Sequence, residues 1–328
     1  MAVRFGQQVM SMVMQRLLLL AGLSLAPLGA QDADLLPTGE LPPGKAILVG
    51  QPHHDDHTTD HGFAGLIARF VDEGYRAIYV RSTNDEKDGP HGYPRNDIIN
   101  MRETVEATAG LGMEKVVPLN WRNNFETPGP LNELREQLIF LIRKYKPEIV
   151  IGHNAWEHYQ KNPGHRSASW ALEEAFWLAG HRNVHPEHFE QGLEPHEASY
   201  HYGKARLDWG LGHTPNIVME FNAEQQRRKI VAYRFSEYAA SPEQARSVRA
   251  DLARRNLYMP EFEGLDDEAA GFQISDWWMD YVSRLHGSYA GVALGEDYYF
   301  MDEFYDLPGL QPYLERNASG AQSGGRSE

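Results

Sequence analysis

The stretch Ala46-Ile-Leu-Val-Gly50, followed after one residue by Pro52-His-His-Asp-Asp-His57, decides the fold. The first five residues are a short apolar run of the kind that forms a buried strand. Three imidazoles and two carboxylates in the next turn are costly to bury unless they are paired or bind a cation. Because ligand sites in open α/β sheets lie beyond the carboxyl ends of strands, this turn is a candidate functional loop. A solvated turn in which Asp55 or Asp56 caps the next helix is the alternative.

Strands and helices alternate along the chain after this stretch. Apolar runs predict further strands, and segments with apolar residues three and four positions apart predict helices. Strands that alternate with helices of this length indicate βαβ units. The predicted fold is therefore α/β and Rossmann-like, with a mainly parallel sheet and helices on both faces. The predicted strands cover 46–50, 76–81, 115–119, 148–151 and 216–221, and the predicted helices cover 63–73, 98–111, 131–145, 167–178 and 223–235.

Composition excludes several classes of function. The chain has 328 residues, and 31 Lys and Arg against 46 Asp and Glu give a formal net charge of −15. Such a chain is a poor partner for nucleic acid or an anionic membrane, which bind clustered Lys and Arg. The absence of Cys excludes disulfides, thiolate nucleophiles, iron–sulfur clusters and Cys-type zinc sites. Any metal must therefore be held by nitrogen and oxygen ligands.

The chain divides into five predicted segments. Residues 1–30 have the pattern of a signal peptide, because Arg16 precedes an apolar run that ends in small residues. The run is too short for a membrane anchor, and Pro27 and Gly29 interrupt it. We expect cleavage after Ala30 and a periplasmic or secreted protein with no stable membrane span. The other segments are a Pro/Gly-rich linker at 31–44, the core at 45–235, an aromatic-rich extension packed on the core at 236–315 and a disordered tail at 316–328.

A second polar cluster follows the fourth predicted strand, between His153 and Arg166. It contains His165, just before the helix predicted from Ser167. Two such loops at the same edge of a parallel sheet can converge on one ion. Two imidazoles and one carboxylate leave a tetrahedral zinc ion with an open position for water, as in catalytic zinc sites. The same donors also accept other divalent metals.

The two motifs resemble those of the GlcNAc-phosphatidylinositol de-N-acetylase family, the PIG-L/LmbE-like proteins. Pro52-His-His-Asp-Asp56 resembles the family signature (A/P)HPDD, and Asn162-Pro-Gly-His-Arg-Ser-Ala168 resembles its second motif, HPDHRAA. Arg102-Glu103 and Leu111-Gly112 are similar to the intervening helix. The resemblance covers about residues 45–235. It implies a Rossmann-like fold and zinc-dependent hydrolysis of an N-acetyl group, usually from an N-acetylglucosamine conjugate.

The resemblance also implies roles for individual residues. His53, Asp56 and His165 would hold the zinc ion, and Asp55 would be the general base towards the attacking water. Once protonated, that base can pass its proton to the leaving amine. The oxyanion that forms needs the metal and a nearby hydrogen-bond donor. The substrate would be a small N-acylated sugar or glycoconjugate.

The second motif departs from the family pattern. Asn162 stands where the family has a His that helps to stabilise the oxyanion, and Gly164 replaces an Asp. Asn162 can still donate a hydrogen bond. Tyr159, His158 or His153 could supply a further donor.

Other positions leave alternatives open. In the first motif, His54 stands where the family has Pro, and His57 stands where it has Glu. Arg102 is a candidate for binding an anionic or sugar group, and an ion pair with Glu106 on the helix surface is the alternative.

Two other functions of the protein are left open: hydrolysis of a different amide or ester by the same metal, and non-catalytic carbohydrate binding.

Overall fold

The structure, a computed structural model, describes residues 35–58, 62–123, 130–154, 162–204, 215–236, 239, 241–301 and 316–317. The predicted signal peptide and nearly all of the predicted tail lie outside these residues. The elements, in chain order, are β1 (Ala46–Gln51), α2 (Ala64–Asp72), β2 (Arg76–Thr83), α3 (Arg95–Leu111), β3 (Lys115–Trp121), α4 (Pro130–Tyr145), β4 (Ile149–His153), α5 (Pro163–Leu178), α6 (Glu187–Glu190), β5 (Tyr200–Lys204), β6 (Ile217–Glu220), α7 (Ala223–Tyr233), α8 (Pro242–Arg254), the 3-10 helix η2 (Pro260–Phe262), α9 (Asp267–Ser288) and β7 (Gly295–Met301).

A seven-stranded sheet in the order β3-β2-β1-β4-β5-β7-β6 forms the centre of the molecule. The five strands from β3 to β5 are parallel to one another, and β7 is antiparallel to both of its neighbours. The predicted α/β fold is therefore confirmed. From β1 the chain moves outward to β2 and β3 and then returns to β4 on the other side of β1. Such a reversal opens a crevice at the carboxyl ends of β1 and β4.

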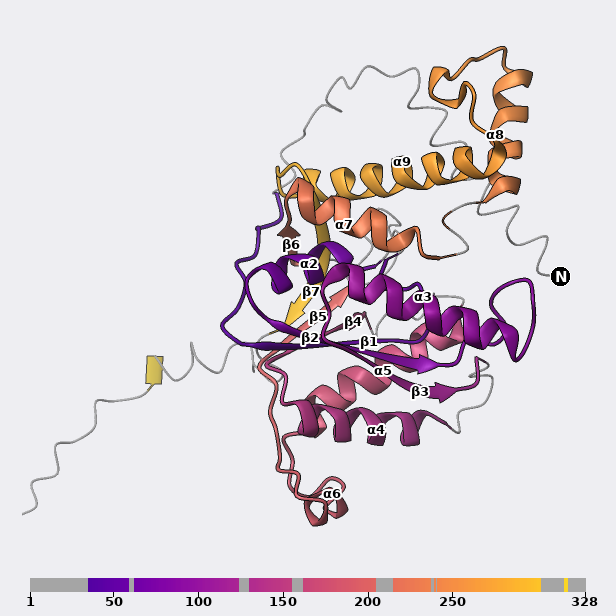
Figure 1. Cartoon of the computed structure of the whole chain (residues 1–328). Helices are drawn as coiled ribbons and strands as arrows, with labels where there is room; N and C mark the ends of the chain where they lie inside the picture. Colours follow the sequence, from indigo (N-terminus) through magenta and orange to yellow (C-terminus); the bar gives the residue numbers. More distant parts are fainter. Residues whose placement is uncertain are drawn as a thin grey trace, which may run out of the picture.

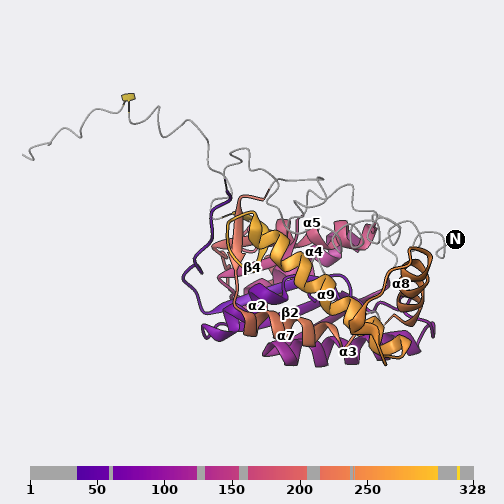
Figure 2. The ribbon, with the colours of Figure 1, turned by 90° about the horizontal axis from the view of Figure 1, so that it is seen from above.

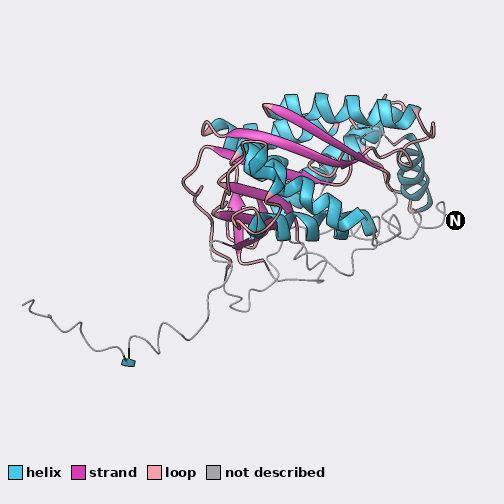
Figure 3. Ribbon diagram, turned by 90° about the horizontal axis from the view of Figure 1, so that it is seen from below, coloured by secondary structure: helices cyan, strands magenta, loops and turns pink. Residues whose placement is uncertain are grey.

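Helices cover both faces of the sheet (Figure 1). Residues of α2, α3 and α7 share one hydrophobic core with Ile47 and Val49 of β1, and residues of α4 and α5 share the other with Leu48. Because successive strand side chains point to opposite faces and both faces of β1 are buried, its residues from Ala46 to Gly50 are all apolar. Figure 2 shows α9 running across the layer that contains α2 and α7, and Figure 3 shows the twisted strands between the helices.

The C-terminal extension contributes a strand to the sheet, whereas the sequence predicted only packing on its surface. β7 is inserted between β5 and β6, and Tyr298 of β7 is fully buried in the main core. The predicted linker also contacts the sheet, because Thr38 forms a bridge with Val218 of β6. Sequence patterns missed β7 because its Glu296 and Asp297 are charged, yet both side chains are buried.

Glu296 connects the extension to the loop after β1. Its carboxylate accepts hydrogen bonds of 3.0 Å from the backbone N–H groups of Gly65 and Leu66, in the first turn of α2. The residue before α2 supplies no side-chain cap of its own. Nζ of Lys229 lies 2.7 Å from Oε1 of Glu296, and the Tyr298 hydroxyl donates to Oε2 at 2.7 Å. A buried carboxylate from β7 therefore caps α2, the helix that follows the loop after β1.

Lys229→Met is expected to lower the free energy of unfolding by about 3–5 kcal/mol, because it leaves the buried Glu296 carboxylate without its charge partner. Urea unfolding at pH 7 measures this loss. Arg284→Met is the control, since Arg284 pairs with Asp280 on the surface and should cost less than about 1 kcal/mol. Equal losses in the two variants would contradict a dominant role for the buried pair.

The Glu296 contact also predicts a pH dependence of stability. Burial raises the pKa of Glu296, but the charges of Lys229 and Lys204 and the hydrogen bonds from Lys229 and Tyr298 bring it below its usual value. A lowered pKa in the folded state stabilises the fold above the unfolded-state pKa of about 4.3, and this contribution is lost as the pH falls further. The stability advantage of the wild type over Glu296→Gln should therefore narrow below about pH 4.3. Unfolding curves of both proteins from pH 7 to 3 test this, and a constant difference would refute it.

Candidate metal centre

The loop after β1 lies at the carboxyl edge of the sheet, beside the strand that precedes α5. β1 and β4 are adjacent and parallel, with Val49 opposite Ile151. In the loop, residues 52–58 are all buried except Asp55, which is half-buried. Burial lowers the pKa of His57 to about 3, so this imidazole is neutral. The remaining polar side chains of the loop are held by one another and by neighbouring strands.

His53, Asp56 and His165 form one compact, buried cluster. Nδ1 of His53 lies 3.2 Å from Oδ2 of Asp56. Nε2 of His165 lies 3.1 Å from Oδ1 of Asp56 and 3.0 Å from Nδ1 of His53. A tetrahedral zinc ion with ligands at about 2.0–2.1 Å has ligand–ligand separations of about 3.3 Å. The two imidazole nitrogens, and the Asp56 oxygen that is nearest to each of them, therefore lie close to this spacing.

The charges of the cluster also suit a cation. Burial lowers the pKa of His53, but the carboxylates of Asp56 and Asp85 outweigh this and raise it to about 10. Burial raises the pKa of Asp56, but the charges of His165 and His53 bring it well below its usual range. The cluster thus holds an ionised carboxylate with two imidazoles around it. A divalent cation would take the place of the imidazole protons, which metal binding releases.

A second group, formed by His54, Asp85 and Asp88, has ligand atoms close together but does not fit a metal. Nδ1 of His54 lies 2.5 Å from Oδ2 of Asp85, a hydrogen-bond distance well below the separation of two ligands on one ion. Nε2 of His54 lies 3.2 Å from Oε2 of Glu103. Burial lowers the pKa of His54, but the charge of Asp55 and the contacts with Asp85 and Glu103 raise it well above its ordinary value. Both ring nitrogens of His54 are therefore held by carboxylates, Asp85 on one side and Glu103 on the other.

A third group, on the surface, combines Glu136, His185, Glu187 and His188. Nη1 of Arg143 lies 3.1 Å from Nδ1 of His188. A guanidinium only donates, so Nδ1 of His188 must accept and the hydrogen of the neutral ring sits on Nε2. No nitrogen of this ring is then available for a metal. This group then lacks one of its two imidazoles, so among the three groups in the described residues the buried cluster of His53, Asp56 and His165 fits an ion best.

Asp55 differs from the rest of the loop in its exposure and in its pKa. It is the only residue of the loop that is partly exposed, with 15% of its side chain accessible. Burial raises its pKa, the charge of His54 lowers it, and the nearby Asp56 and Asp85 raise it again, so the pKa lies above its ordinary value. A carboxylate with a raised pKa accepts protons more readily than an ordinary Asp. The geometry is compatible with the predicted general base, which stays a prediction.

Helix α5 begins four residues earlier than predicted. Asn162 is its N-cap, and the Asn162 side-chain oxygen accepts a hydrogen bond from the N–H of Gly164 at 2.8 Å. His165 therefore lies in the first turn of the helix and not before it. The prediction failed because Pro and Gly usually indicate loops, whereas Pro163 occupies the first helical position, where its missing N–H costs nothing. Since the oxygen of Asn162 is used by the cap, the side-chain NH₂ is the group left to meet a substrate.

Gly164 leaves room for the ring of His53. A Cβ at position 164 would lie 3.0 Å from Nε2 of His53 and 3.0 Å from Oδ1 of Asn162. These contacts are tighter than ordinary van der Waals contact, so the imidazole would have to move. The position of the His53 ring, a predicted metal ligand, therefore depends on the absence of a side chain at position 164.

Gly164→Ala is expected to weaken zinc binding several-fold without lowering the thermal stability of the metal-free protein, because Ala favours helix over Gly by up to about 1 kcal/mol. Competition with a chelator measures the affinity, and calorimetry of the metal-free protein measures the stability. Gly110→Ala in α3 is the matched control, since a Cβ there meets only Cε2 of Phe235, at 3.7 Å. Unchanged zinc affinity in Gly164→Ala would contradict this dependence.

The candidate hydrogen-bond donors fall in different places. His153, at the end of β4, stacks on His165 with ring centroids 4.6 Å apart, and its Nε2 lies 4.0 Å from Oδ1 of Asp56. It therefore lies directly beside the cluster. Tyr159 and His158 lie outside the described residues, and their roles stay predictions.

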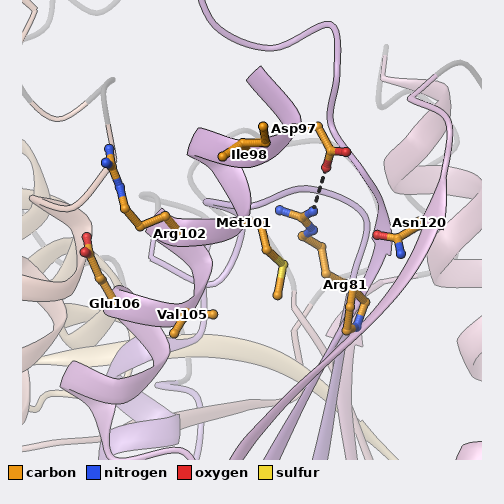
Figure 4. Close-up of a pocket in the computed structure, with 9 residues that line it drawn as sticks. Arg81, Asp97, Ile98, Met101, Arg102, Val105, Glu106 and Asn120 are labelled. Atoms are coloured by element: carbon orange, nitrogen blue, oxygen red, sulfur yellow. Dashed lines mark hydrogen bonds and ion pairs between the residues drawn. The ribbon is translucent and has the colours of Figure 1, made fainter. Parts of the chain in front are cut away.

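Arg102 lines a separate pocket of about 570 Å³ between α3 and the strands β2 and β3. Figure 4 shows Arg102 and Glu106 projecting from one side of α3, while Arg81 and Asp97 lie on the other. The next residue, Glu103, is the one that contacts the loop after β1, through His54. The predicted role of Arg102 in substrate binding stays a prediction.

Three residues around the cluster were not predicted as part of the site. Asp85 accepts hydrogen bonds from the backbone N–H and Nδ1 of His54, at 3.0 and 2.5 Å. Asn123 contacts Nε2 of His53 at 3.2 Å, and Glu103 contacts Nε2 of His54. Asp85 follows β2 and Asn123 follows β3, so both stand at the carboxyl ends of strands near β1. That position in the sheet was the signal available in the sequence.

Comparison with known families gives a match over the part of the chain that contains this cluster. Residues 48–176 match the PIG-L family, described as GlcNAc-PI de-N-acetylase. The matched region contains His53, Asp56 and His165. This part of the chain is therefore similar to the PIG-L family.

The sequence identity to individual relatives is low. The chain is 29% identical over 181 residues to the diacetylchitobiose deacetylase of Thermococcus kodakarensis. This match covers 54% of the chain and 64% of the relative, so less than two thirds of the relative is matched.

Two solved structures share the fold. The N,N'-diacetylchitobiose deacetylase of Pyrococcus horikoshii has a TM-score of 0.60 and 21% identity, over 81% of this chain and 89% of that one. The 4-carboxy-2-hydroxymuconate hydratase of Pseudomonas putida has a TM-score of 0.59 and 15% identity, over 80% and 98%. One fold thus occurs in a deacetylase and in a hydratase, so the reaction must be argued from the site.

Proposed function

We propose that this protein is a zinc-dependent hydrolase that removes an N-acetyl or other N-acyl group from an amino-sugar conjugate. The observation that carries the proposal is the cluster of His53, Asp56 and His165, whose donor atoms lie 3.0–3.2 Å apart. The PIG-L family match and the similarity to a diacetylchitobiose deacetylase support the reaction and the class of substrate.

The residues of the site divide the chemistry among them. His53, Asp56 and His165 would hold the zinc ion, which when bound would polarise a carbonyl and make water a better nucleophile near pH 7. Asp55 accepts a proton as the water oxygen bonds to the amide carbon. When the carbon–nitrogen bond breaks, Asp55 returns that proton to the leaving amine, and a carboxylic acid and a free amine result. The NH₂ group of Asn162 donates to the oxyanion in between.

Release of acetate from N,N'-diacetylchitobiose and other N-acetylglucosamine conjugates tests the proposal. Zinc-loaded protein should release acetate, and the Asp55→Asn variant, prepared in the same way, should release it about 10²- to 10⁴-fold more slowly. A zinc-loaded wild type that releases no acetate across the panel would contradict N-deacetylation. Turnover of other amides or esters by that protein would then favour the alternative hydrolase, and zinc binding with no turnover would favour a carbohydrate-binding relative.

We also propose that the chain is exported and cleaved after Ala30, as the signal-like pattern of residues 1–30 predicts. Among the described residues, no helix is long and apolar enough to cross a membrane. The test is expression of the full chain, cell fractionation and sequencing of the mature N-terminus. A mature protein that starts at Gln31 outside the cytoplasm supports export, whereas an uncleaved cytoplasmic protein overturns it.

A further inference from the structure

A chain of three side chains leads from β2 to the candidate metal ligand His53. Asp85 follows β2, is fully buried and has a positive φ of 59°. Its Oδ1 accepts a hydrogen bond from Nδ2 of Asn123 at 2.6 Å. Oδ1 of Asn123 lies 3.2 Å from Nε2 of His53. The backbone of Asn123 is also fixed, because its N–H donates to Oε2 of the buried Glu86 at 2.8 Å.

The direction of these hydrogen bonds follows from what each atom can do. An ionised carboxylate only accepts, so the atom of Asn123 that faces Asp85 must be the NH₂ nitrogen. The amide oxygen of Asn123 then faces His53. Because a carbonyl oxygen only accepts, Nε2 of His53 must carry a hydrogen. The orientation of the Asn123 amide is therefore assigned from the charge of Asp85, because the oxygen and nitrogen ends of an amide cannot be told apart by shape.

A hydrogen on Nε2 decides which nitrogen of His53 can bind a metal. A neutral imidazole has one N–H and one lone pair, so the lone pair lies on Nδ1. Nδ1 is the atom that faces the cluster, 3.2 Å from Asp56 and 3.0 Å from Nε2 of His165. The opposite tautomer would direct an N–H group at the ion.

We infer that Asp85 is a positioning residue, which acts through the amide of Asn123 to hold His53 in the tautomer whose Nδ1 faces the metal. This inference rests on the proposed function, since it needs an ion at the cluster. A side-chain amide can turn around, unlike the backbone carbonyl that often orients a metal-ligating His. The carboxylate of Asp85 is what keeps the amide from turning.

The nearly isosteric variant Asp85→Asn tests this directly. With an amide at position 85, Asn123 can turn its oxygen towards residue 85 and its NH₂ group towards His53, which favours the wrong tautomer. Zinc affinity should then fall by about 10- to 100-fold, the usual loss for a residue that orients a metal ligand. Asp297→Asn is the matched control: Asp297 is also a fully buried carboxylate, paired with Lys204, and should lose stability but not zinc affinity.

A double variant tests whether zinc affinity depends on the direction of these hydrogen bonds or on the negative charge at position 85. Asp85→Asn with Asn123→Asp exchanges donor and acceptor, so that the new amide at position 85 would donate to the new carboxylate at position 123, and that carboxylate would still accept from His53. Each single variant places two like groups opposite each other, whereas the double variant restores every hydrogen bond. We expect it to recover most of the zinc affinity and the visible spectrum of the Co²⁺-substituted protein.

The measurements are zinc competition titrations, Co²⁺ spectra, urea unfolding of the metal-free proteins, and nitrogen NMR of the histidine rings in the zinc-loaded wild type. A hydrogen on Nδ1 of His53 in the wild type would overturn the inference even if no variant folds. Unchanged affinity in Asp85→Asn, or a folded double variant that binds no better than Asp85→Asn, would also overturn it. A wild type that binds no zinc would contradict the proposed function itself, and the inference with it.

Discussion

Asp55→Asn is expected to reduce the rate of N-acetyl hydrolysis by about 10²- to 10⁴-fold, the usual contribution of a general base. The change keeps the shape of the side chain and removes its ability to accept a proton. Asp55 is also the one residue of the loop at 52–58 that is partly exposed, so a bound substrate can reach it. Acetate release under saturating substrate measures the effect.

Zinc content separates this role from metal binding. Asp55→Asn should bind zinc with the affinity of the wild type, because the three donor atoms of the cluster belong to other residues. Asp280→Asn, an exposed carboxylate on α9, is the control and should leave the rate unchanged. A loss of less than tenfold in a fully zinc-loaded Asp55→Asn protein would rule out Asp55 as the base.

His53→Ala and His165→Ala should each lower zinc affinity by more than the ~100-fold that loss of an orienting residue can cost. Each variant removes one of three protein donors, and the carboxylate of Asp56 with one imidazole is a poor site for zinc. Hydrolysis should be lost with the metal. Elemental analysis after dialysis against a weak chelator measures the loss.

The surface group around His185 supplies the control for these variants. If the group of Glu136, His185, Glu187 and His188 held zinc, His185→Ala would lower the zinc content. We expect instead one zinc per chain in the wild type and in His185→Ala, because this group lies on the surface and Arg143 occupies the lone pair of one of its two imidazoles, that of His188. Full zinc occupancy in both His53→Ala and His165→Ala would refute the site.

Much of the fold could be predicted because its signals are local. β1 to β4 are short apolar runs, and the helices between them have apolar residues at helical spacing, so the parallel sheet followed from periodicity alone. β7 could not be predicted in this way. Its Glu296 and Asp297 are buried only because Lys229 and Lys204 neutralise them, and both lysines are distant in the sequence. A charged strand inside a sheet becomes favourable only once its partners are in place.

The start of α5 was predicted wrongly for a different reason. Asn162-Pro163-Gly164 is typical of a loop, but the same three residues form an N-cap and a first turn. The conformational preferences of these residues did not distinguish a loop from the start of a helix. The difference decides whether His165 lies before the helix or in its first turn.

The sequence predicted, through its resemblance to the family motifs, that His53, Asp56 and His165 would lie together, and the structure brings these three residues together. His53 and Asp56 lie directly after β1, and in a parallel sheet that position leads to the same edge as the end of β4. What only the tertiary structure decided is how these groups are held: Asn123 contacts His53 from 70 residues away, and Glu296 caps α2 from 231 residues away. Hydrogen bonds act over about 3 Å in space and leave no periodic pattern along the chain. The residue types of the site are therefore readable in the sequence, whereas the proton positions and supports that would make it work require the folded molecule.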